Sequence, residues 1–169
     1  MTELSYRPCV GIMVVNRDGL VWVGQRADMP GYAEGPGQWW QMPQGGIDKG
    51  EEPGAAALRE VFEETSMRSL QVLGKSQDWL TYDLPPELLG IAWGGKYRGQ
   101  RQMWFAMRFT GADSEIDIGP RAGHDVEFVA WKWCPVEELI GAIVPFKQEV
   151  YRAVVGELGG FARPASGSD

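Results

Sequence analysis

The chain has 169 residues, and its 16 Lys and Arg against 23 Asp and Glu give a formal charge of −7 at pH 7. This length suits one domain, and a content of 44% hydrophobic and 23% charged residues is typical of a globular protein rather than a disordered one. Because sequence-independent nucleic-acid binding depends on Lys and Arg at phosphates, the acidic balance argues against a DNA-binding platform. A phosphate substrate would need positive charge from another source.

Membrane insertion and disulfide chemistry are also disfavoured by the sequence. No apolar run approaches the roughly 20 residues of a membrane span, and the first residues lack the basic and apolar regions of a signal peptide. We therefore expect a cytoplasmic protein without a membrane partner. Cys9 and Cys134 are too few for a disulfide framework and have no zinc-site spacing, so we expect buried thiols.

Strands are predicted at six places along the chain, the first two of which are joined by a turn. Residues 9–15 and 21–25 are rich in β-forming side chains, and Asn16 to Gly19 between them form a typical hairpin turn. Residues 27–38 contain two prolines and three glycines, which predicts a loop. Further strands are expected at residues 70–73, 79–83, 103–110 and 127–133.

Helices are predicted at residues 53–65, 135–143 and 147–158. The first begins with a proline, which is favourable in the first turn. At 100° per residue its apolar side chains cluster on one side, which should be buried. They are Ala55, Leu58, Val61, Phe62 and Thr65. The element order favours an α/β fold in which helices cover a mixed sheet, with one domain at residues 1–160 and a disordered tail at 161–169.

Three glutamates share an arc of the first helix, opposite the predicted apolar stripe. Like charges three and four residues apart destabilise a helix by roughly 0.2 to 0.5 kcal/mol per pair, so Glu60, Glu63 and Glu64 are unfavourable there unless neutralised. Mg²⁺ or Mn²⁺ would neutralise them, since these ions bind carboxylates together with substrate phosphates. The alternative is a solvated acidic face on which Arg59 pairs with Glu63.

The spacing around these glutamates matches a known pattern. The chain reads Gly45-X5-Glu51-X7-Arg59-Glu60-Val61-X-Glu63-Glu64-X-Ser66-Met67. This resembles the Nudix box, GX5EX7REUXEEXGU with U aliphatic, and departs from it only where Ser66 replaces a glycine. The resemblance implies an α/β/α sandwich around a central mixed sheet, in which a loop and a helix present metal-binding carboxylates to a diphosphate linkage.

Physical roles can be assigned to several box positions. Gly45 and Gly46 have no side chain, so the backbone there can approach a metal ion or a phosphate closely. We expect Glu51 and Arg59 to form a structural ion pair. Ser66 falls where a helix often ends in a left-handed residue, a conformation that is less favourable for serine than for glycine.

The flanking sequence narrows the resemblance. It is similar to the bacterial RNA pyrophosphohydrolase group, which also includes dinucleoside polyphosphate hydrolases, at residues 6–8, 40–47, 99–105 and 145–151. Residues 79–86 and 93–100 resemble plant-type hydrolases that cleave diadenosine tetraphosphate asymmetrically. The resemblance implies 5′-triphosphate RNA as the first choice of substrate, with a dinucleoside polyphosphate as the alternative.

The resemblance also implies the site residues. Metal ligation would involve Glu60, Glu63, Glu64, Glu127 and a backbone oxygen near Gly45. Glu63 or Glu127 would act as the base, and Glu64 belongs to the same catalytic set. A bland alternative for Glu127 is a solvent-facing residue at a sheet edge.

Substrate contacts are expected on several segments. The predicted set is Arg7, Arg26, Gln44, Tyr82, Gln100, Gln102, Phe146 and Lys147. Its basic members would bind phosphates, while Phe146 would stack on a base. Trp93 or Tyr97 could receive a second adenine, and Trp39 or Trp40 is a further ligand contact. Most other tryptophans should be core residues, including Trp131 and Trp133, which alternate along one predicted strand face with residues 127 and 129.

Two other function classes fit the sequence less well. An isomerase of the same fold would need a cysteine beside the metal site, whereas Cys9 begins one predicted strand and Cys134 follows another. An inactive Nudix domain acting as a nucleotide sensor would be expected to have lost box carboxylates, yet all three are present. His124, which lies in a Gly-His-Asp segment, is interpreted as a loop residue rather than a base. The oligomeric state is left open.

Overall fold

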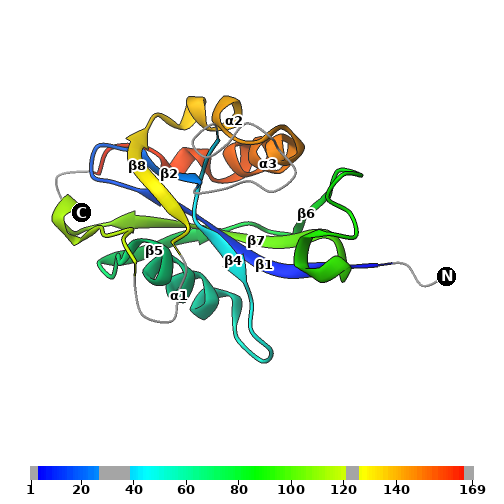
Figure 1. The fold of residues 1–169 in the computed structure, drawn as a ribbon. Helices are drawn as coiled ribbons and strands as arrows, with labels where there is room; N and C mark the ends of the chain where they lie inside the picture. Colours follow the sequence, from blue (N-terminus) through cyan, green and yellow to red (C-terminus); the bar gives the residue numbers. More distant parts are fainter. Residues whose placement is uncertain (1–3, 27–38, 121–125, 166–169) are drawn as a thin grey trace.

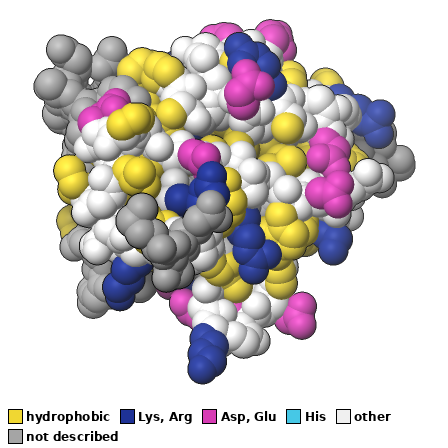
Figure 2. Space-filling model, turned by 90° about the vertical axis from the view of Figure 1, so that its right-hand side faces the viewer, with side chains coloured by type: hydrophobic (Ala, Val, Ile, Leu, Met, Phe, Trp, Pro, Cys, Tyr) yellow, Lys and Arg dark blue, Asp and Glu magenta, His cyan; other side chains and the backbone are white. Residues whose placement is uncertain are grey.

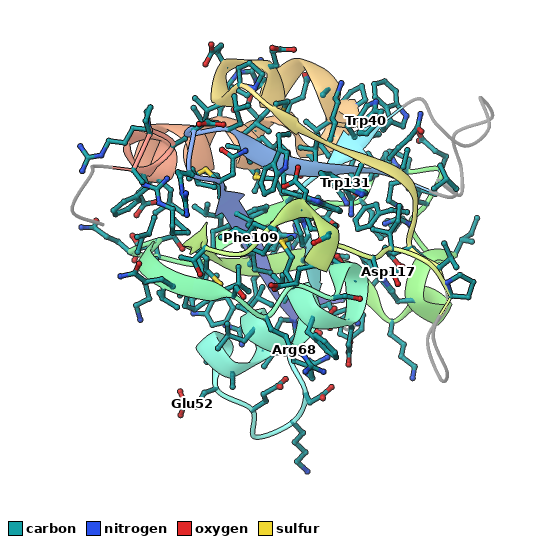
Figure 3. The ribbon with its side chains drawn as sticks, turned by 90° about the vertical axis from the view of Figure 1, so that its left-hand side faces the viewer. Trp40, Glu52, Arg68, Phe109, Asp117 and Trp131 are labelled. Carbon is teal, nitrogen blue, oxygen red and sulfur yellow. The ribbon has the colours of Figure 1, made fainter. Side chains whose placement is uncertain are left out.

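The computed structural model describes residues 4–26, 39–120 and 126–165. Figure 1 shows a mixed β-sheet with α1 on one face and α2 and α3 on the other, which confirms the expected α/β sandwich. Figure 3 shows the same layers from the side, with Glu52 and Arg68 in the α1 layer, Trp40 toward the opposite layer and Phe109 between them. Within these ranges no helix is both long enough and apolar enough to cross a membrane.

Eight strands and three α-helices make up the described fold. The strands are β1 (Ser5–Val15), β2 (Val21–Arg26), β3 (Trp40–Gln41), β4 (Gln44–Gly46), β5 (Leu70–Lys75), β6 (Leu80–Asp83), β7 (Tyr97–Phe109) and β8 (Phe128–Cys134). The helices are α1 (Pro53–Thr65), α2 (Leu139–Ala142) and α3 (Gln148–Leu158). Short 3₁₀ turns precede both α2 and α3, at Val136–Glu138 and Pro145–Lys147.

The sheet is organised around one parallel pair, β1 and β7. These strands pair from Ser5↔Tyr97 to Val15↔Arg108 with one register shift between Ser5 and Tyr6, whereas the other pairings of the sheet are antiparallel. The path through the sheet is β3-β2-β1-β7-β5, with β4 on β1, β6 on β7 and β8 on β2. Because β4 pairs with β1 at Cys9↔Gly46, the glycines that precede α1 are fixed to the centre of the sheet.

Both faces of the sheet are buried in its centre, which is why the second halves of β1 and β7 read as nearly continuous apolar runs. On one face, side chains of β1 and β7 such as Ile12 and Phe105 pack against α1. On the other, Met13 and Trp104 pack against α3. The tryptophan prediction is confirmed for Trp22 and Trp104, which are fully buried.

The predicted buried face of α1 was wrong in part. Its buried residues are Ala56, Ala57, Val61 and Thr65, whereas Leu58 is 44% exposed. Phe62 is only partly buried and lies under the guanidinium of Arg68, 4.5 Å from its ring centre. Small alanines therefore face the sheet, and the arc that carries glutamates is turned toward β4 rather than away from the protein. The helical-wheel prediction placed Leu58 and Phe62 in the buried stripe and therefore missed this orientation of α1.

A β-bulge changes which residues of β8 share a face. Gln25 pairs with Ala130 and Arg26 pairs with Phe128, so Val129 has no partner in the ladder. Val129 is 53% exposed, and Phe128 packs with Trp131 and Trp133 instead. The expected alternation of residues 127, 129, 131 and 133 on one face was therefore wrong at its start, because the extra residue reverses the alternation.

Other differences concern the ends of elements. β1 and β7 begin earlier than predicted, and β3 and β4 were missed because each has at most three residues. Phe161 packs on the core and the Ala165 N–H donates to the Arg17 carbonyl at 2.8 Å, so residues 161–165 are held against the fold rather than free as expected. The predicted loop at 27–38 and His124 lie outside the described residues.

Two glycine-to-alanine changes should have opposite effects on stability. A Cβ at Gly11 would overlap the indole of buried Trp104, so Gly11→Ala should destabilise the protein by about 1 to 3 kcal/mol through overpacking. Gly156 lies within α3 and has open space around it, so Gly156→Ala should stabilise by roughly 0.5 to 1 kcal/mol. Urea unfolding of both variants measures the difference, and equal effects would contradict the packing described here.

Candidate active site

A cleft of about 590 Å³ opens beside the β1–β7 pair, next to β4 and to Glu60 and Glu64 in the C-terminal half of α1. Its described lining residues include carboxylates, cations, amides and apolar side chains. They are Arg7, Arg26, Gln44, Gly45, Gly46, Glu60, Glu64, Tyr82, Leu84, Leu88, Ile91, Ala92, Trp93, Gln100, Glu127, Phe146 and Lys147. Figure 2 looks onto the side where β1 begins and β6 connects to β7, and shows basic, acidic and hydrophobic side chains interspersed there.

Three carboxylates form one wall of the cleft. Burial raises the pKa of Glu60 to about 7, against the opposing effect of Arg59. Burial also raises the pKa of Glu64 well above its usual value, and the nearby carboxylates of Glu127 and Glu60 add to this. Gly45 leaves room for this wall, because a Cβ there would overlap the Glu60 carboxyl group. Burial therefore disfavours the charged forms of Glu60 and Glu64, which a bound cation would stabilise.

Arg59 joins the loop before α1 to the helix itself. Its Nε and Nη2 donate to the Glu51 carboxylate at 2.9 and 2.8 Å, and Nη2 also donates to the Gly46 carbonyl at 2.9 Å. Its Nη1 donates to Glu60 at 2.9 Å and to Glu63 at 3.2 Å. The expected Glu51–Arg59 ion pair is confirmed, and Glu63 is held by Arg59 instead of lining the cleft.

The end of α1 adopts the left-handed conformation expected for this position. Ser66 has φ 69° and its N–H donates to the Phe62 carbonyl at 2.8 Å, as glycine commonly does at a helix end. Its hydroxyl donates to the Asp117 carbonyl at 3.0 Å. A glycine could not make this second bond, which offsets part of the penalty of the backbone conformation.

Three basic side chains also line the cleft. Arg26 donates through Nη1 to Glu127 at 3.1 Å, so this glutamate is part of the site rather than a solvent-facing edge residue. Lys147 is 5% exposed, and its burial, together with Arg26 nearby, lowers its pKa to about 7. The Arg7 guanidinium lies over Gly46, where a side chain would displace it. The cleft thus contains three basic side chains although the chain as a whole is acidic.

Aromatic and apolar groups complete the cleft. The Lys147 ammonium lies 5.7 Å from the Tyr82 ring centre, and the rings of Tyr82 and Phe146 are 5.6 Å apart. Trp93 also lines the cleft, and its ring centre lies 5.7 Å from the Arg7 guanidinium carbon. Trp39 and Trp40 are not among the described lining residues, and the Trp40 ring instead faces Lys132 at 4.4 Å.

The structure therefore brings most of the predicted site together. Ten of the predicted side chains line the cleft with the Gly45 backbone, whereas Glu63 and Gln102 do not. Sequence reasoning missed the apolar side made by Leu84, Leu88 and Ile91. These residues belong to an apolar segment between two predicted strands. The segment could be recognised in the sequence, but an apolar segment alone does not distinguish the wall of a cleft from a buried loop.

The carboxylate wall suits a hard cation. Glu64 Oε2 is buried and has no hydrogen-bond partner, which is unfavourable unless a donor or a cation reaches it. In their present positions, no three acidic, histidine or cysteine side chains of the described ranges are arranged to hold a metal ion. The donor set of Glu60, Glu64 and Glu127 is nevertheless the oxygen-only type that Mg²⁺ and Mn²⁺ prefer.

Comparison with known proteins agrees with this geometry, since the NUDIX domain family matches residues 5–154. The chain belongs to the Nudix family. Curated relatives named RNA pyrophosphohydrolase from Brucella abortus (strain 2308) and Brucella anthropi are each 58% identical over 155 residues. The match spans 90% of this chain, 87% of the first relative and 89% of the second.

Solved Nudix structures share the fold at lower identity. A C. elegans Ap4A hydrolase complex has a TM-score of 0.63 at 19% identity, covering 91% of this chain and 98% of that one. The E. coli dihydroneopterin triphosphate pyrophosphohydrolase has a TM-score of 0.62 at 20% identity, covering 89% and 97%. At these identities the likeness concerns the sandwich alone.

The two cysteines do not supply a reactive thiolate to this Nudix site. Burial raises the pKa of Cys9 to about 11, even though Arg7 Nη1 donates to its sulfur at 3.6 Å. Burial likewise raises the pKa of Cys134 to about 11. Both thiols are therefore protonated near neutral pH, as expected for structural cysteines.

The Glu51–Arg59 pair predicts a pH-dependent contribution to stability. The Arg59 guanidinium and the Asp48 N–H lower the pKa of Glu51 from 4.5 to about 2. A folded-state pKa below the unfolded value stabilises the fold above pH 4.5, and this contribution is lost as the pH falls toward 2. Glu51→Gln should therefore be less stable than the natural protein at neutral pH, with a smaller difference at about pH 3. Urea unfolding at both pH values measures this, and a constant difference would exclude a charge effect.

Proposed function

We propose that this chain is a divalent-metal-dependent hydrolase of phosphoanhydride bonds that removes pyrophosphate from the 5′ end of triphosphorylated RNA. The observation that carries the proposal is a cleft of about 590 Å³ that is lined by three carboxylates and three basic side chains. A metal ion at the carboxylates and a phosphate chain at the basic side chains would compensate both kinds of charge. The relatives' name, RNA pyrophosphohydrolase, supports the choice of substrate.

Mg²⁺, or Mn²⁺ in its place, fits the carboxylate wall best. Glu60, Glu64 and Glu127 would hold it together with a backbone oxygen near Gly45, and Glu63 would support them through Arg59. When bound, such an ion makes a water molecule more acidic and offsets charge on phosphate oxygens. The unpartnered Glu64 Oε2 supports this assignment.

The chain's own groups would bind the substrate and accept a proton. Arg7, Arg26 and Lys147 would hold the phosphate oxygens, since charge-assisted hydrogen bonds suit buried anions. Phe146 would stack against a base. We assign the role of base to Glu127 rather than Glu63, because Glu127 lines the cleft and Glu63 does not.

Asymmetric cleavage of diadenosine tetraphosphate to ATP and AMP is the second candidate activity. It is supported by the apolar side of the cleft, where Trp93 offers a ring for a second base. We place the RNA end first, because the cations and Phe146 need only one nucleoside. An inactive sensor domain fits poorly with three carboxylates gathered in the cleft. We further propose that the enzyme works in the cytoplasm.

Replacing one cleft carboxylate by its amide should lower the activity without unfolding the protein. We expect Glu64→Gln to lower kcat at least ~100-fold, because both water activation and charge neutralisation depend on the bound ion. It should also reduce the rise in Tm that Mg²⁺ gives the natural protein by binding its folded state.

Glu52→Gln on the same helix is the matched control. Glu52 is exposed and its side chain caps no N–H group, so this variant should keep both the activity and the Mg²⁺ response. Unchanged activity of Glu64→Gln at saturating Mg²⁺ would remove Glu64 from the site.

The choice of substrate is tested by measuring kcat/KM side by side. A short triphosphorylated RNA should give monophosphorylated RNA and pyrophosphate faster than diadenosine tetraphosphate gives ATP and AMP. A preference of more than about tenfold for the dinucleotide, or about 1.4 kcal/mol of transition-state binding, would reverse the assignment.

A further inference from the structure

Three glutamines and one tryptophan form a hydrogen-bonded chain behind the cleft. Trp104 Nε1 donates to Gln102 Oε1 at 2.8 Å. Gln102 Nε2 in turn donates to Gln100 Oε1 at 2.7 Å and to Gln44 Oε1 at 3.3 Å. Gln102 is 1% exposed and is not among the described residues that line the cleft, whereas Gln44 and Gln100 are. Gln102 was predicted to contact the substrate, and the structure places it one layer further back.

Trp104 fixes the direction of this chain. An indole N–H can only donate, so the Gln102 atom that faces it must be the oxygen. Turning the Gln102 amide over would bring two donors together at Trp104 and would set oxygen against oxygen at Gln44 and Gln100. The orientation of this buried amide therefore follows from its neighbours.

Trp104 itself has little freedom to move. Its backbone N–H donates to the Ser76 hydroxyl at 3.1 Å, and its ring meets that of Tyr151 edge-on at 5.7 Å. The absence of a side chain at Gly11 provides the space that the indole fills. The direction of the amide chain is thus set by a rigid part of the core.

The orientation of Gln102 determines which side-chain groups of Gln44 and Gln100 are left for the cleft. Gln44 and Gln100 each use the side-chain oxygen on Gln102, so what each has left for the cleft is its NH₂ group. We propose that Gln102 is a positioning residue that makes Gln44 and Gln100 present two uncharged N–H donors to the phosphate chain of the substrate. The phosphate ligand rests on the proposed function, but the orientation of the amides does not.

Uncharged donors suit this location. A phosphate chain accepts hydrogen bonds, so NH₂ groups attract it, whereas amide oxygens in the same place would repel it. Unlike further cations, amides would not oppose a metal ion on the carboxylate wall. Because these donors touch the chain before and during the reaction alike, their loss should raise KM and leave kcat nearly unchanged.

The test compares Gln102→Met, Gln100→Met and the double variant on short triphosphorylated RNA. Two neutral hydrogen bonds predict a rise in KM of up to about tenfold for Gln102→Met, with kcat nearly unchanged. If Gln102 acts through Gln100, the double variant should raise KM by less than the product of the single effects. Multiplicative effects, or a fall in kcat alone, would overturn the proposal.

Gln71→Met is the matched control, because Gln71 is exposed on β5 and should leave KM unchanged. If Gln102→Met fails to fold by circular dichroism, Gln102→Glu replaces it. A carboxylate at this position accepts from Trp104 but cannot donate, so the neighbouring amides should turn their oxygens outward and KM should rise further. An unchanged KM for Gln102→Glu would overturn the proposal.

Binding of inorganic triphosphate by calorimetry separates this inference from the choice of RNA as substrate. We expect Gln102→Met to weaken this binding while Gln71→Met does not, whichever nucleotide the enzyme prefers. If the natural protein leaves RNA uncleaved but the variant still loses triphosphate affinity, the proposed function fails and the positioning role stands. Equal affinities of Gln102→Met and the natural protein would refute the positioning role even if RNA is cleaved.

Discussion

The site depends on the way one guanidinium connects two segments of the chain. Arg59 binds the Gly46 carbonyl and the Glu51 carboxylate on the loop side, and Glu60 and Glu63 on the helix side. Without Arg59 these contacts between the loop and α1 would be lost, and the angle at which α1 leaves the loop would not be fixed by them. The glutamates of the helix would then also repel one another. The same contacts explain why Glu63, although part of the box, does not line the cleft.

The cleft brings acidic and basic side chains together within a protein that is acidic overall. Glu60 and Glu64 have raised pKa values because burial disfavours their charged forms, and Lys147 has a lowered pKa for the same reason. Such groups are poorly satisfied by one another alone, since only Arg26 and Glu127 make a direct ion pair across the described cleft. The arrangement favours ligands that bring their own positive and negative groups.

Hydrophobic periodicity predicted the helices and most strands, because it is a local signal, whereas most cleft residues were implied by the resemblance of the box and its flanking segments to a known family. Prediction from the sequence failed where position depends on distant partners. The bulge at Val129 arises from pairing with β2, and the rotation of α1 arises from packing alanines on the sheet. Gln102 could not be told from Gln100, because both precede the strand predicted at residues 103–110 and only the hydrogen bond from Trp104 marks Gln102 as internal.

The parallel pairing of β1 with β7 also constrains how the protein can be made. Arg7 lies on β1, and β4 with Gly45 and Gly46 pairs with β1, yet the parallel partner of β1 comes about 90 residues later in the chain. A ribosome releases the N-terminal part first, so β1 must wait without its central neighbour while the segment through residue 109 is synthesised. Contacts this distant in sequence form slowly. The cleft is therefore among the last parts of the fold to assemble, and β1, an apolar strand, is the segment most in need of protection until then.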